Sequence, residues 1–408
     1  MKVGIIGLGY VGLPLAIAFQ KKYDVYAYDN NNKKIAQLKN NYDKTNELSK
    51  KELKNLSNIK FSNKISDLKD CKIFIIAVPT PINKKNNPDL SILKKACVSV
   101  AKIMKINSIV VFESTVYPGV TEEICVPILS KYSALKYNKE FFCGYSPERI
   151  NPGDKIHNIN NIVKLTSGST EKISRIVDNL YSKVIDAGTY RAKSIKIAEA
   201  AKSIENAQRD INIAFINELK IIFDKMNLDL YEILKAAQTK WNFLKFEPGL
   251  VGGHCIGVDP YYLSYISQKY KHVPRIILSG RNINDNFHNH IIEDFAKKFK
   301  KPILRKKILI LGFAFKENCR DCRNTKINNL YKGLKKKGFK VEIFDPHVDK
   351  KDVWKVYKIK ILSKIKKNKY DGVIVAVKHD YFKKIGLNKI ISFCKKKHVL
   401  YNFKNLKI

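Results

Sequence analysis

A glycine-rich turn near the start of the chain constrains the fold more than any other feature. Lys2-Val-Gly-Ile-Ile6 is a short apolar run that predicts a buried strand, and Gly7-Leu-Gly-Tyr-Val-Gly12 connects it to a predicted helix over residues 13–20. A second predicted strand, residues 24–29, ends on the carboxylate of Asp29, about 20 residues after the first glycine. This order of elements is typical of a doubly wound α/β domain that binds a dinucleotide.

The residues of this turn also predict how a dinucleotide is held. Gly7 permits a tight turn, Gly9 lets the backbone approach a pyrophosphate, and Gly12 allows close packing of the helix on the strand. The helix N-terminus adds the positive end of its dipole. Asp29 would accept hydrogen bonds from ribose hydroxyls and repel a 2′-phosphate, so the sequence favours NAD over NADP.

Further strands are predicted at residues 73–78 and 108–112, and each ends in a polar loop. Val78-Pro-Thr-Pro81 is rigid and should border the nicotinamide side of the cofactor. Thr115 and Glu148 follow successive strands, and ligands bind outside the carboxyl ends of parallel strands, so we expect both to face one crevice. A helix cap or a loop turn is the alternative for each. The predicted cofactor residues are Gly7, Gly9, Tyr10, Val11, Gly12, Asp29, Pro79, Thr80 and Thr115.

A second glycine-rich segment, Gly249-Leu-Val-Gly-Gly-His-Cys-Ile-Gly-Val-Asp259, carries a single thiol, Cys255. Its glycines allow backbone conformations and close approaches that side chains would prevent. We therefore predict that Cys255 is a nucleophile and that Asp259 shares its pocket, although most free cysteines are buried structural residues. Just upstream, Trp241-Asn-Phe-Leu-Lys-Phe246 offers aromatic faces and a cation to a ring and a phosphate.

The middle of the chain predicts a long helix. From Arg191 to Glu247 there is no glycine or proline, and apolar residues recur at helical spacing between Ile197 and Ile222. We expect this helix to connect two lobes and to contribute to a homodimer interface. Lys202 and Asn206 are four residues apart and so share one face, although such polar pairs often belong to a solvated face.

After Lys300 the pattern of the first domain returns in weaker form. Residues 307–312, 341–345 and 372–377 predict three more buried strands, without a second Gly-x-Gly-x-x-Gly turn. The loop from Gly312 to Arg323 carries cations suited to a nucleotide other than NAD. The predicted fold class is therefore α/β, with two Rossmann-like lobes joined by a helical middle. The predicted domains are residues 1–192, 193–300 and 301–408.

Composition excludes several other classes of protein. The formal net charge of +40 comes mainly from scattered lysines, which predicts solvated faces and no specific nucleic-acid site. Cys319-Arg-Asp-Cys322 lacks the second ligand pair of a zinc site, and His288-Asn-His290 is interpreted as a solvated helix face, so no metal is predicted. After the apolar N-terminal run from Val3 to Phe19, no apolar run reaches the roughly 18 residues of a membrane span. We expect a cytoplasmic protein without membrane insertion.

Taken together, these residues resemble the UDP-glucose/GDP-mannose dehydrogenase superfamily over essentially the whole chain. Glu113-Ser-Thr-Val-Tyr-Pro-Gly119, Tyr145-Ser-Pro-Glu-Arg-Ile-Asn-Pro-Gly153 and Gly252-Gly-His-Cys-Ile-Gly-Val-Asp-Pro-Tyr-Tyr262 are most similar to its UDP-N-acetylhexosamine branch. The resemblance implies oxidation of a sugar C6 alcohol to a carboxylate with two NAD in turn. The substrate would be UDP-GlcNAc or UDP-GalNAc, and the product would enter surface polysaccharide biosynthesis.

The resemblance also implies residue roles. Cys255 would form a thiohemiacetal and then a thioester, and Lys202 and Asn206 would stabilise the oxyanion. Asp259 would position water or handle protons, Glu148 would act as base, and Thr115 would help to hold the water. Arg281 and Lys316 would meet the uridine diphosphate, and Arg323 would reach across the dimer. The implied substrate residues are Glu148, Arg149, Lys202, Asn206, Phe243, Lys245, Phe246, Gly249, Gly252, His254, Arg281, Phe315, Lys316 and Arg323.

Two departures from the glucose-specific branch bear on the substrate. Val258 stands where that branch has a lysine, and Pro152 stands where it has a second glutamate. Both disfavour UDP-glucose, which stays an alternative together with UDP-N-acetylmannosamine. A two-electron dehydrogenase that needs no thiol is the rival enzyme, and a basic nucleic-acid-binding protein is the rival from another class.

Overall fold

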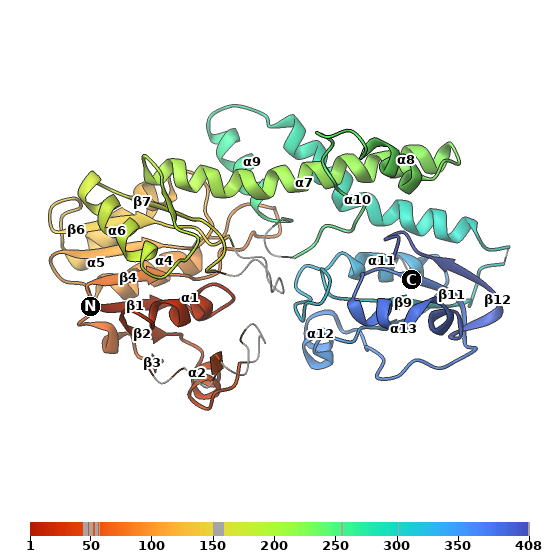
Figure 1. Cartoon of the computed structure of the whole chain (residues 1–408), viewed down its shortest axis with the longest axis horizontal. Helices are drawn as coiled ribbons and strands as arrows, with labels where there is room; N and C mark the ends of the chain where they lie inside the picture. The colour runs from red at the N-terminus through yellow and green to blue at the C-terminus, as the bar shows by residue number, and fades with distance from the viewer. Residues whose placement is uncertain are drawn as a thin grey trace. The chain divides into compact units, whose positions relative to one another are not determined.

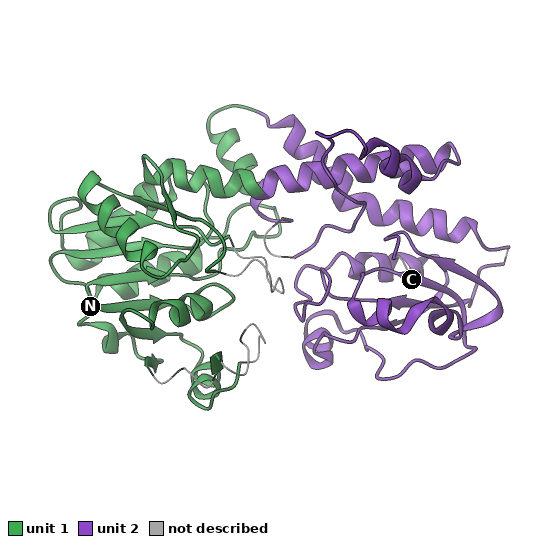
Figure 2. Ribbon diagram, in the orientation of Figure 1, with its two compact units in different colours: residues 1–205, 261–272 green, residues 206–260, 273–408 purple. Residues whose placement is uncertain are grey.

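The computed structural model describes residues 1–43, 48, 52–53, 56, 58–149, 159–253, 256–300 and 302–406. The chain forms two compact units (Figures 1 and 2). The first contains residues 1–205 and 261–272, and the second contains residues 206–260 and 273–408. Both units combine a largely parallel sheet with helices, so the α/β fold class predicted from the sequence is confirmed.

The first unit is built on an eight-stranded sheet. Neighbouring strands are parallel except for the sixth and seventh, which pair antiparallel. In spatial order the strands are β3 (Ile59–Ser62), β2 (Asp24–Tyr28), β1 (Lys2–Ile6), β4 (Ile73–Ile76), β5 (Ser108–Phe112), β6 (Phe141–Tyr145), β7 (Lys164–Gly168) and β8 (Thr189–Arg191). Strand order reverses between β1 and β4, which is where ligands bind in such sheets.

Short helices connect these strands and complete the core. An apolar cluster of this unit joins the sheet to α1, α2 and α6, with Leu15, Leu38 and Val177 as examples from the three helices. The strands β4 and β5 are buried along their whole length, as expected for parallel strands covered on both faces. The helices are α1 (Gly12–Phe19), α2 (Asn32–Lys39), η1 (Ile65–Leu68), α4 (Ser91–Ala101), η2 (Thr121–Cys125), α5 (Val126–Ser133) and α6 (Glu171–Ser182).

The second unit carries a four-stranded parallel sheet in the order β10 (Lys340–Phe344), β9 (Lys307–Leu311), β11 (Tyr370–Val375) and β12 (Cys394–Tyr401). Alternate residues of β9 enter different cores. Ile308 and Ile310 pack with α10 and α11, and Leu309 and Leu311 pack with α13. Helices therefore cover both faces of this sheet too. Besides α7 (Ile195–Lys225) and α9 (Asp259–Lys269), the described helices of this unit are α8 (Leu230–Ala237), α10 (Arg275–Lys297), α11 (Ile327–Lys336), α12 (Lys350–Tyr357) and α13 (Asp380–Ile391).

Two helices begin in one unit and end in the other. The helix α7 spans Ile195–Lys225, 31 residues, which confirms the long helix predicted from the absence of glycine and proline. The helix α9 spans Asp259–Lys269 and follows the segment that contains Cys255. Along α7, Ile197, Ile204, Phe215 and Ile222 are each more than 40% exposed, so the periodic apolar residues do not all enter a core.

Several details differ from the sequence prediction. The helix predicted over residues 13–20 is α1, Gly12–Phe19, and the strand predicted over 73–78 ends at Ile76. The strands β7 and β8 were not predicted. The interpretation of His288 and His290 as a solvated face is wrong, because both are half-buried and His290 Nε2 lies 2.7 Å from Asp224 Oδ2.

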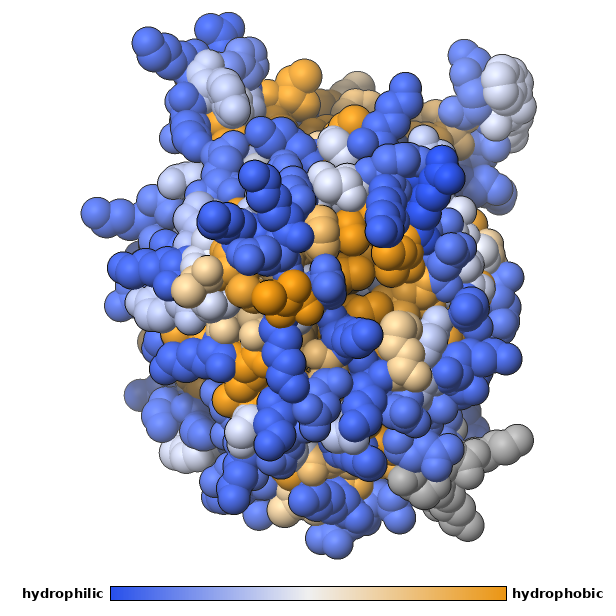
Figure 3. Space-filling view, turned by 90° about the vertical axis from the view of Figure 1, so that its left-hand side faces the viewer, coloured by the Kyte–Doolittle hydropathy of each residue, from blue (hydrophilic) through white to orange (hydrophobic). Residues whose placement is uncertain are grey.

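The surface of the protein shows where hydrophilic side chains of this highly charged chain lie. Hydrophilic side chains surround smaller apolar areas on the face in Figure 3. No helix in the described ranges combines the length and the apolar character that a membrane crossing requires. The three domain boundaries drawn from the sequence stay a prediction.

Candidate active site

The predicted cofactor turn lies at the carboxyl end of β1. Gly7 has φ +94°, a conformation that side chains disfavour, and its N–H donates to the carbonyl of Tyr28 at 2.8 Å. A Cβ on Gly9 would meet nothing within 4 Å, so the space above this residue is open on the protein side. The turn therefore leaves room at the position where the sequence places a pyrophosphate.

Asp29 directly follows β2, and its carboxylate forms hydrogen bonds that hold the glycine turn in place. Its Oδ2 accepts a hydrogen bond from Leu8 N–H at 3.0 Å and its Oδ1 accepts one from Asn31 N–H at 2.9 Å. Lys34 of α2 places its Nζ 2.9 Å from Oδ2. The carboxylate has the position predicted for a ribose contact, and a cation that the sequence reading missed lies beside it.

The loops after β4 and β5 are tied to each other. Thr80 Oγ1 donates to the carbonyl of Thr115 at 2.6 Å, and Ser114 Oγ donates to the carbonyl of Val78 at 2.6 Å. The hydroxyl of Tyr262, on α9, donates to the carbonyl of Thr80. Pro79, Thr80 and Thr115 therefore lie in loops that are tied together at the carboxyl ends of β4 and β5, and their contact with the cofactor stays a prediction.

The N-terminal part of α7 holds the next stretch of this loop. The buried carboxylate of Glu199 accepts hydrogen bonds from Gly119 N–H at 2.5 Å and Thr121 N–H at 2.9 Å. Ser203 Oγ donates to the carbonyl of Val116 at 3.2 Å. Burial raises the pKa of Glu199 to about 7. Because Lys202 is adjacent to Ser203 and only 7% exposed, the same helix turn that anchors the loop carries the predicted oxyanion donor.

Glu148, the predicted base, belongs to a buried polar cluster at the ends of three strands. Lys164 Nζ, on β7, lies 3.5 Å from Glu148 Oε2 and 2.7 Å from Glu113 Oε2. Glu148 Oε1 accepts a hydrogen bond from Arg149 N–H at 2.6 Å. The Arg149 guanidinium pairs in turn with Glu205 of α7 at 2.7 Å. The sequence reading included Glu113 in a motif without a role and missed Lys164.

In the second unit the structure joins two predicted catalytic residues. Asn206 Nδ2, on α7, donates to Asp259 Oδ2 at 2.5 Å, across 53 positions of sequence. Asp259 is 2% exposed and opens α9. This bond fixes the orientation of the Asn206 amide, so its carbonyl and amide ends cannot exchange freely.

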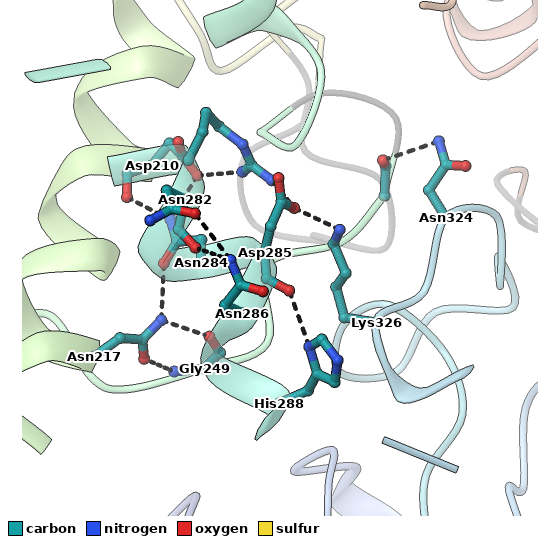
Figure 4. Close-up of polar contacts among 12 residues, drawn as sticks. Asp210, Asn217, Gly249, Asn282, Asn284, Asp285, Asn286, His288, Asn324 and Lys326 are labelled. Atoms are coloured by element: carbon teal, nitrogen blue, oxygen red, sulfur yellow. Dashed lines mark hydrogen bonds and ion pairs between the residues drawn. The ribbon is translucent and has the colours of Figure 1, made fainter. Parts of the chain in front are cut away.

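A buried network holds the start of the second glycine segment (Figure 4). Asn217 Nδ2 donates to Gly249 O at 3.0 Å, and Gly249 N–H donates to Asn217 Oδ1 at 2.8 Å. Asn284 Oδ1 accepts from Asn217 Nδ2 at 2.8 Å, and Asn284 Nδ2 donates to Asp210 Oδ1 at 2.7 Å. The sequence did not predict a role for Asp210 and Asn217 on α7 or for Asn284 on α10. Their only signal was a polar residue on the inner face of a long helix.

Arg281, predicted to contact the uridine diphosphate, is part of this network. It is 2% exposed, with Nη1 2.7 Å from Asp210 Oδ1 and Nη2 2.5 Å from Asp285 Oδ1. Lys326 also pairs with Asp285 at 2.5 Å. The structure places Arg281 among carboxylates of its own unit, and its contact with a diphosphate stays a prediction.

The glycine segment also approaches the loop that follows β9. A Cβ on Gly253 would lie 2.7 Å from the ring of Phe315, and a Cβ on Gly252 would lie 2.7 Å from the carbonyl of Asn324. Phe315 and Lys316 are half-buried in that loop, and Arg323 is exposed and pairs with Asp321. The structure therefore brings Gly253 against Phe315, one of the predicted substrate residues, and its neighbour Gly252 against the backbone at Asn324.

The aromatic segment before Gly249 divides into two parts. Phe243 and Phe246 are half-buried and pack against the small apolar cluster of Ile216, Leu230 and Leu234. Lys245 is exposed. His254 and Cys255, which carry the strongest chemical prediction, lie outside the described residues, as does Pro152.

Comparison with protein families decides the assignment. Residues 1–185 match the NAD binding domain of the UDP-glucose/GDP-mannose dehydrogenase family, residues 196–286 match its central domain, and residues 309–407 match its UDP binding domain. The chain belongs to this family. The resemblance seen in the sequence is thereby confirmed, and so are the predictions of an enzyme and of NAD as its cofactor.

Relatives across the whole length refine the placement within the UDP-glucose/GDP-mannose dehydrogenase family. A UDP-N-acetyl-D-glucosamine 6-dehydrogenase of Salmonella typhi is 52% identical over 407 residues, which is 99% of this chain and 96% of that protein. One from Pseudomonas aeruginosa is 49% identical over 409 residues, 100% and 97% of the two chains. A solved UDP-D-ManNAc dehydrogenase of Pyrococcus horikoshii is 28% identical, with a TM-score of 0.87 over 99% and 96% of the chains. The protein is an NAD-dependent dehydrogenase of a UDP-sugar.

Proposed function

We propose that this dehydrogenase oxidises the C6 hydroxyl of a UDP-N-acetylhexosamine, UDP-GlcNAc or UDP-GalNAc, to a carboxylate. The observation that carries the proposal is the 52% identity over 99% of the chain to a UDP-N-acetyl-D-glucosamine 6-dehydrogenase. The overall change consumes the alcohol, two NAD and one water, and it yields the carboxylate, two NADH and three protons. NAD supplies the hydride acceptor in both oxidations.

The thiol of Cys255 divides this oxidation into manageable steps. The first hydride leaves C6 and gives an aldehyde, to which the Cys255 thiolate adds as a thiohemiacetal. Loss of the second hydride leaves a thioester, and water cleaves its C–S bond to release the acid and the thiol. Lys202 and Asn206 would donate to the oxygen that carries charge in these steps.

The described residues support the remaining roles. The Asn206 amide is held by Asp259, which suits a donor that must keep one orientation. Glu148 accepts a hydrogen bond from the backbone N–H of Arg149 and lies beside the Lys164 ammonium, and these contacts hold its carboxylate in place for a role as base toward water. Thr115, two residues from Glu113, would help to hold that water.

The acetamido sugar is preferred over glucose for two reasons. Val258, where the glucose-specific branch has a lysine, is buried and 4% exposed, so it cannot replace that charge. Pro152 replaces a second glutamate, which would make hydrolysis depend more on Glu148. A pocket with polar groups for the acetamido group leaves them unpaired with UDP-glucose, a larger penalty than a lost methyl contact. UDP-N-acetylmannosamine is the second candidate because the Pyrococcus horikoshii relative acts on it.

We also propose a homodimer that uses α7. Ile197, Ile204, Phe215 and Ile222 are all exposed on this one helix, alongside other exposed large apolar side chains among the described residues. Exposed apolar residues at helical spacing are typical of an interaction surface. Light scattering on the full chain tests this, and a monomer at micromolar concentration would remove it. We keep the expectation of a cytoplasmic enzyme of surface polysaccharide biosynthesis.

A panel of UDP-sugars with an NADH readout tests the reaction. UDP-GlcNAc or UDP-GalNAc should be oxidised at least about tenfold faster than UDP-glucose. Two NADH should appear per sugar, since the aldehyde is captured by Cys255. Cys255→Ala should abolish the acid product, whereas a two-electron dehydrogenase would keep its activity. One NADH per sugar with a free aldehyde or ketone as product would contradict the mechanism, and faster turnover of UDP-glucose would remove only the choice of sugar.

The rival from another class has its own test. A specific nucleic-acid-binding protein would shift a nucleic acid on a gel at moderate salt with a preference for sequence or structure. The net charge of +40 by itself predicts weak binding that salt abolishes.

A further inference from the structure

A lysine with no part in the proposed reaction lies buried between two carboxylates in the first unit. Lys164 is 3% exposed, and each of the three N–H donors of its ammonium has an acceptor. These are Glu113 Oε2 at 2.7 Å, the carbonyl of Pro147 at 3.0 Å and Glu148 Oε2 at 3.5 Å. The other oxygen of Glu113 accepts from Tyr181 Oη, on α6, at 2.5 Å.

The cluster joins four elements at one edge of the sheet. Glu113 follows β5, Glu148 follows β6, Lys164 begins β7 and Tyr181 belongs to α6. An unpaired charge in such a place would cost several kcal/mol, so the three charged groups are mutually dependent. The backbone N–H of Arg149 also donates to Glu148, and the Arg149 guanidinium pairs with Glu205 at 2.7 Å.

We propose that Lys164 and Glu113 are positioning residues for Glu148: the Lys164 ammonium holds the Glu148 carboxylate oriented toward thioester hydrolysis, and Glu113 fixes that ammonium in place. This inference rests on the proposed function, which makes Glu148 the base. Neither residue touches the reacting atoms. Both act through the field and the hydrogen bonds that they present to Glu148.

The electrostatics give the direction of each effect. Removal of the ammonium leaves two buried carboxylates side by side with no cation between them, and Glu148 loses the donor that orients it. Ionised Glu113 fixes the ammonium through its 2.7 Å ion pair, so the orientation of Glu148 is held most firmly once Glu113 has lost its proton.

The ionisation of Glu113 gives this cluster a pH dependence. Burial, opposed by Lys164 and reinforced by Glu148, raises the pKa of Glu113 to about 7. Lys164 itself stays charged, because the two carboxylates outweigh its burial and raise its pKa. Hydrolysis should therefore show a step up near pH 7, as Glu113 ionises.

Single-turnover experiments on the full chain test the proposal. The sugar adduct on Cys255 is followed by intact mass at several pH values, which reports hydrolysis apart from the hydride steps. Lys164→Met should slow hydrolysis by at least about tenfold and remove the step near pH 7, and Lys164→Arg should restore part of the rate. Glu113→Gln should remove the step near pH 7. Lys369→Met, which breaks a similar Lys–Glu–Tyr group remote in sequence, is the matched control and should leave the step unchanged.

The outcomes separate the inference from the proposed function. Glu148→Gln should accumulate the adduct at every pH, and its absence would show that Glu148 is not the base. If the adduct accumulates in Glu148→Gln while Lys164→Met and Glu113→Gln keep the wild-type profile, the role of Lys164 and Glu113 is wrong. If Lys164→Met does not fold, Glu113→Gln decides, and retention of the step near pH 7 overturns the proposal.

Discussion

The turns that follow β1 in the first sheet and β9 in the second begin with the same conformation and hydrogen bonds, and they differ from their third residue on. Gly7 after β1 and Gly312 after β9 have φ +94° and +98°, and each N–H donates at 2.8 Å to the last residue of the neighbouring strand. The next N–H, Leu8 or Phe313, donates to an aspartate that follows that strand, at 3.0 Å and 2.6 Å. Up to this point the two turns obey the same steric and hydrogen-bonding demands.

The third residue of each turn separates their uses. Gly9 has open space where a Cβ would stand, while its counterpart in the second sheet is the buried Ala314. Asp29 accepts two backbone N–H groups and pairs with Lys34, whereas Asp345 accepts four, from Phe313, Ala314, His347 and Val348, and is contacted by His379. Asp345 is thus held by more backbone donors than Asp29, whose contact with a ribose stays a prediction.

The largest expected effect is on the shared glycine of the second sheet. A Cβ on Gly312 would lie 2.5 Å from Val377 Cβ, at a φ that alanine disfavours, so Gly312→Ala should destabilise the protein by about 3 kcal/mol. Urea unfolding measures this. Gly188→Ala is the control. Gly188 has φ +80°, but a Cβ added there would meet no atom within 4 Å, so this substitution should cost only about 1 kcal/mol. Equal losses in the two variants would show that the contact with Val377 is unimportant.

The second effect is on the aspartate of the same sheet. Asp345→Asn places a donor against backbone donors and should cost about 2–3 kcal/mol at pH 7. Although burial opposes ionisation, hydrogen bonds from His379 and from the backbone hold the pKa of Asp345 below its ordinary value. A depressed pKa contributes stability above the unfolded value, so the gap between variant and wild type should close only below about pH 4. A gap that closes between pH 7 and 5 would contradict this account.

The third effect should appear in binding and leave stability unchanged. Gly9→Ala adds a methyl group to open space, so the unfolding free energy should stay within about 0.5 kcal/mol of wild type. NAD affinity should fall by about tenfold or more, because the backbone could no longer approach the pyrophosphate. Calorimetric titration measures it, with UDP as the control ligand whose affinity should not change. Unaltered NAD affinity would mean that the open space is not the cofactor site.

The smallest effect concerns the cation beside Asp29. Lys34 is about one-third exposed and lies 2.9 Å from Oδ2, so it reduces the repulsion between Asp29 and a 2′-phosphate. Lys34→Met should raise the ratio of kcat/KM for NAD over NADP by about threefold. Steady-state kinetics with both cofactors measures this ratio. A lower ratio in the variant would show that Lys34 supports NAD binding in another way.

Much of the fold could be predicted because its signals are local. The Gly7–Gly12 turn, the carboxylate after β2 and the absence of helix breakers in α7 each act within a few residues. The strands β7 and β8 could not be predicted, since polar residues interrupt their short apolar runs. Lys164 is one of those residues, and it reads as a solvated lysine until β5 and β6 supply its acceptors.

By itself, the sequence determined the α/β class, the family, the cofactor turn and the positions of the candidate reactive residues, because glycine conformations and helix periodicity are properties of neighbouring residues. Only the tertiary structure decided which polar groups hold them. Lys164 meets Glu113 across 51 positions, Asn206 meets Asp259 across 53, and Asn217 meets Gly249 across 32. The partner of a buried polar group is set by which strand ends and helix faces meet in space, and that depends on the packing of the whole unit.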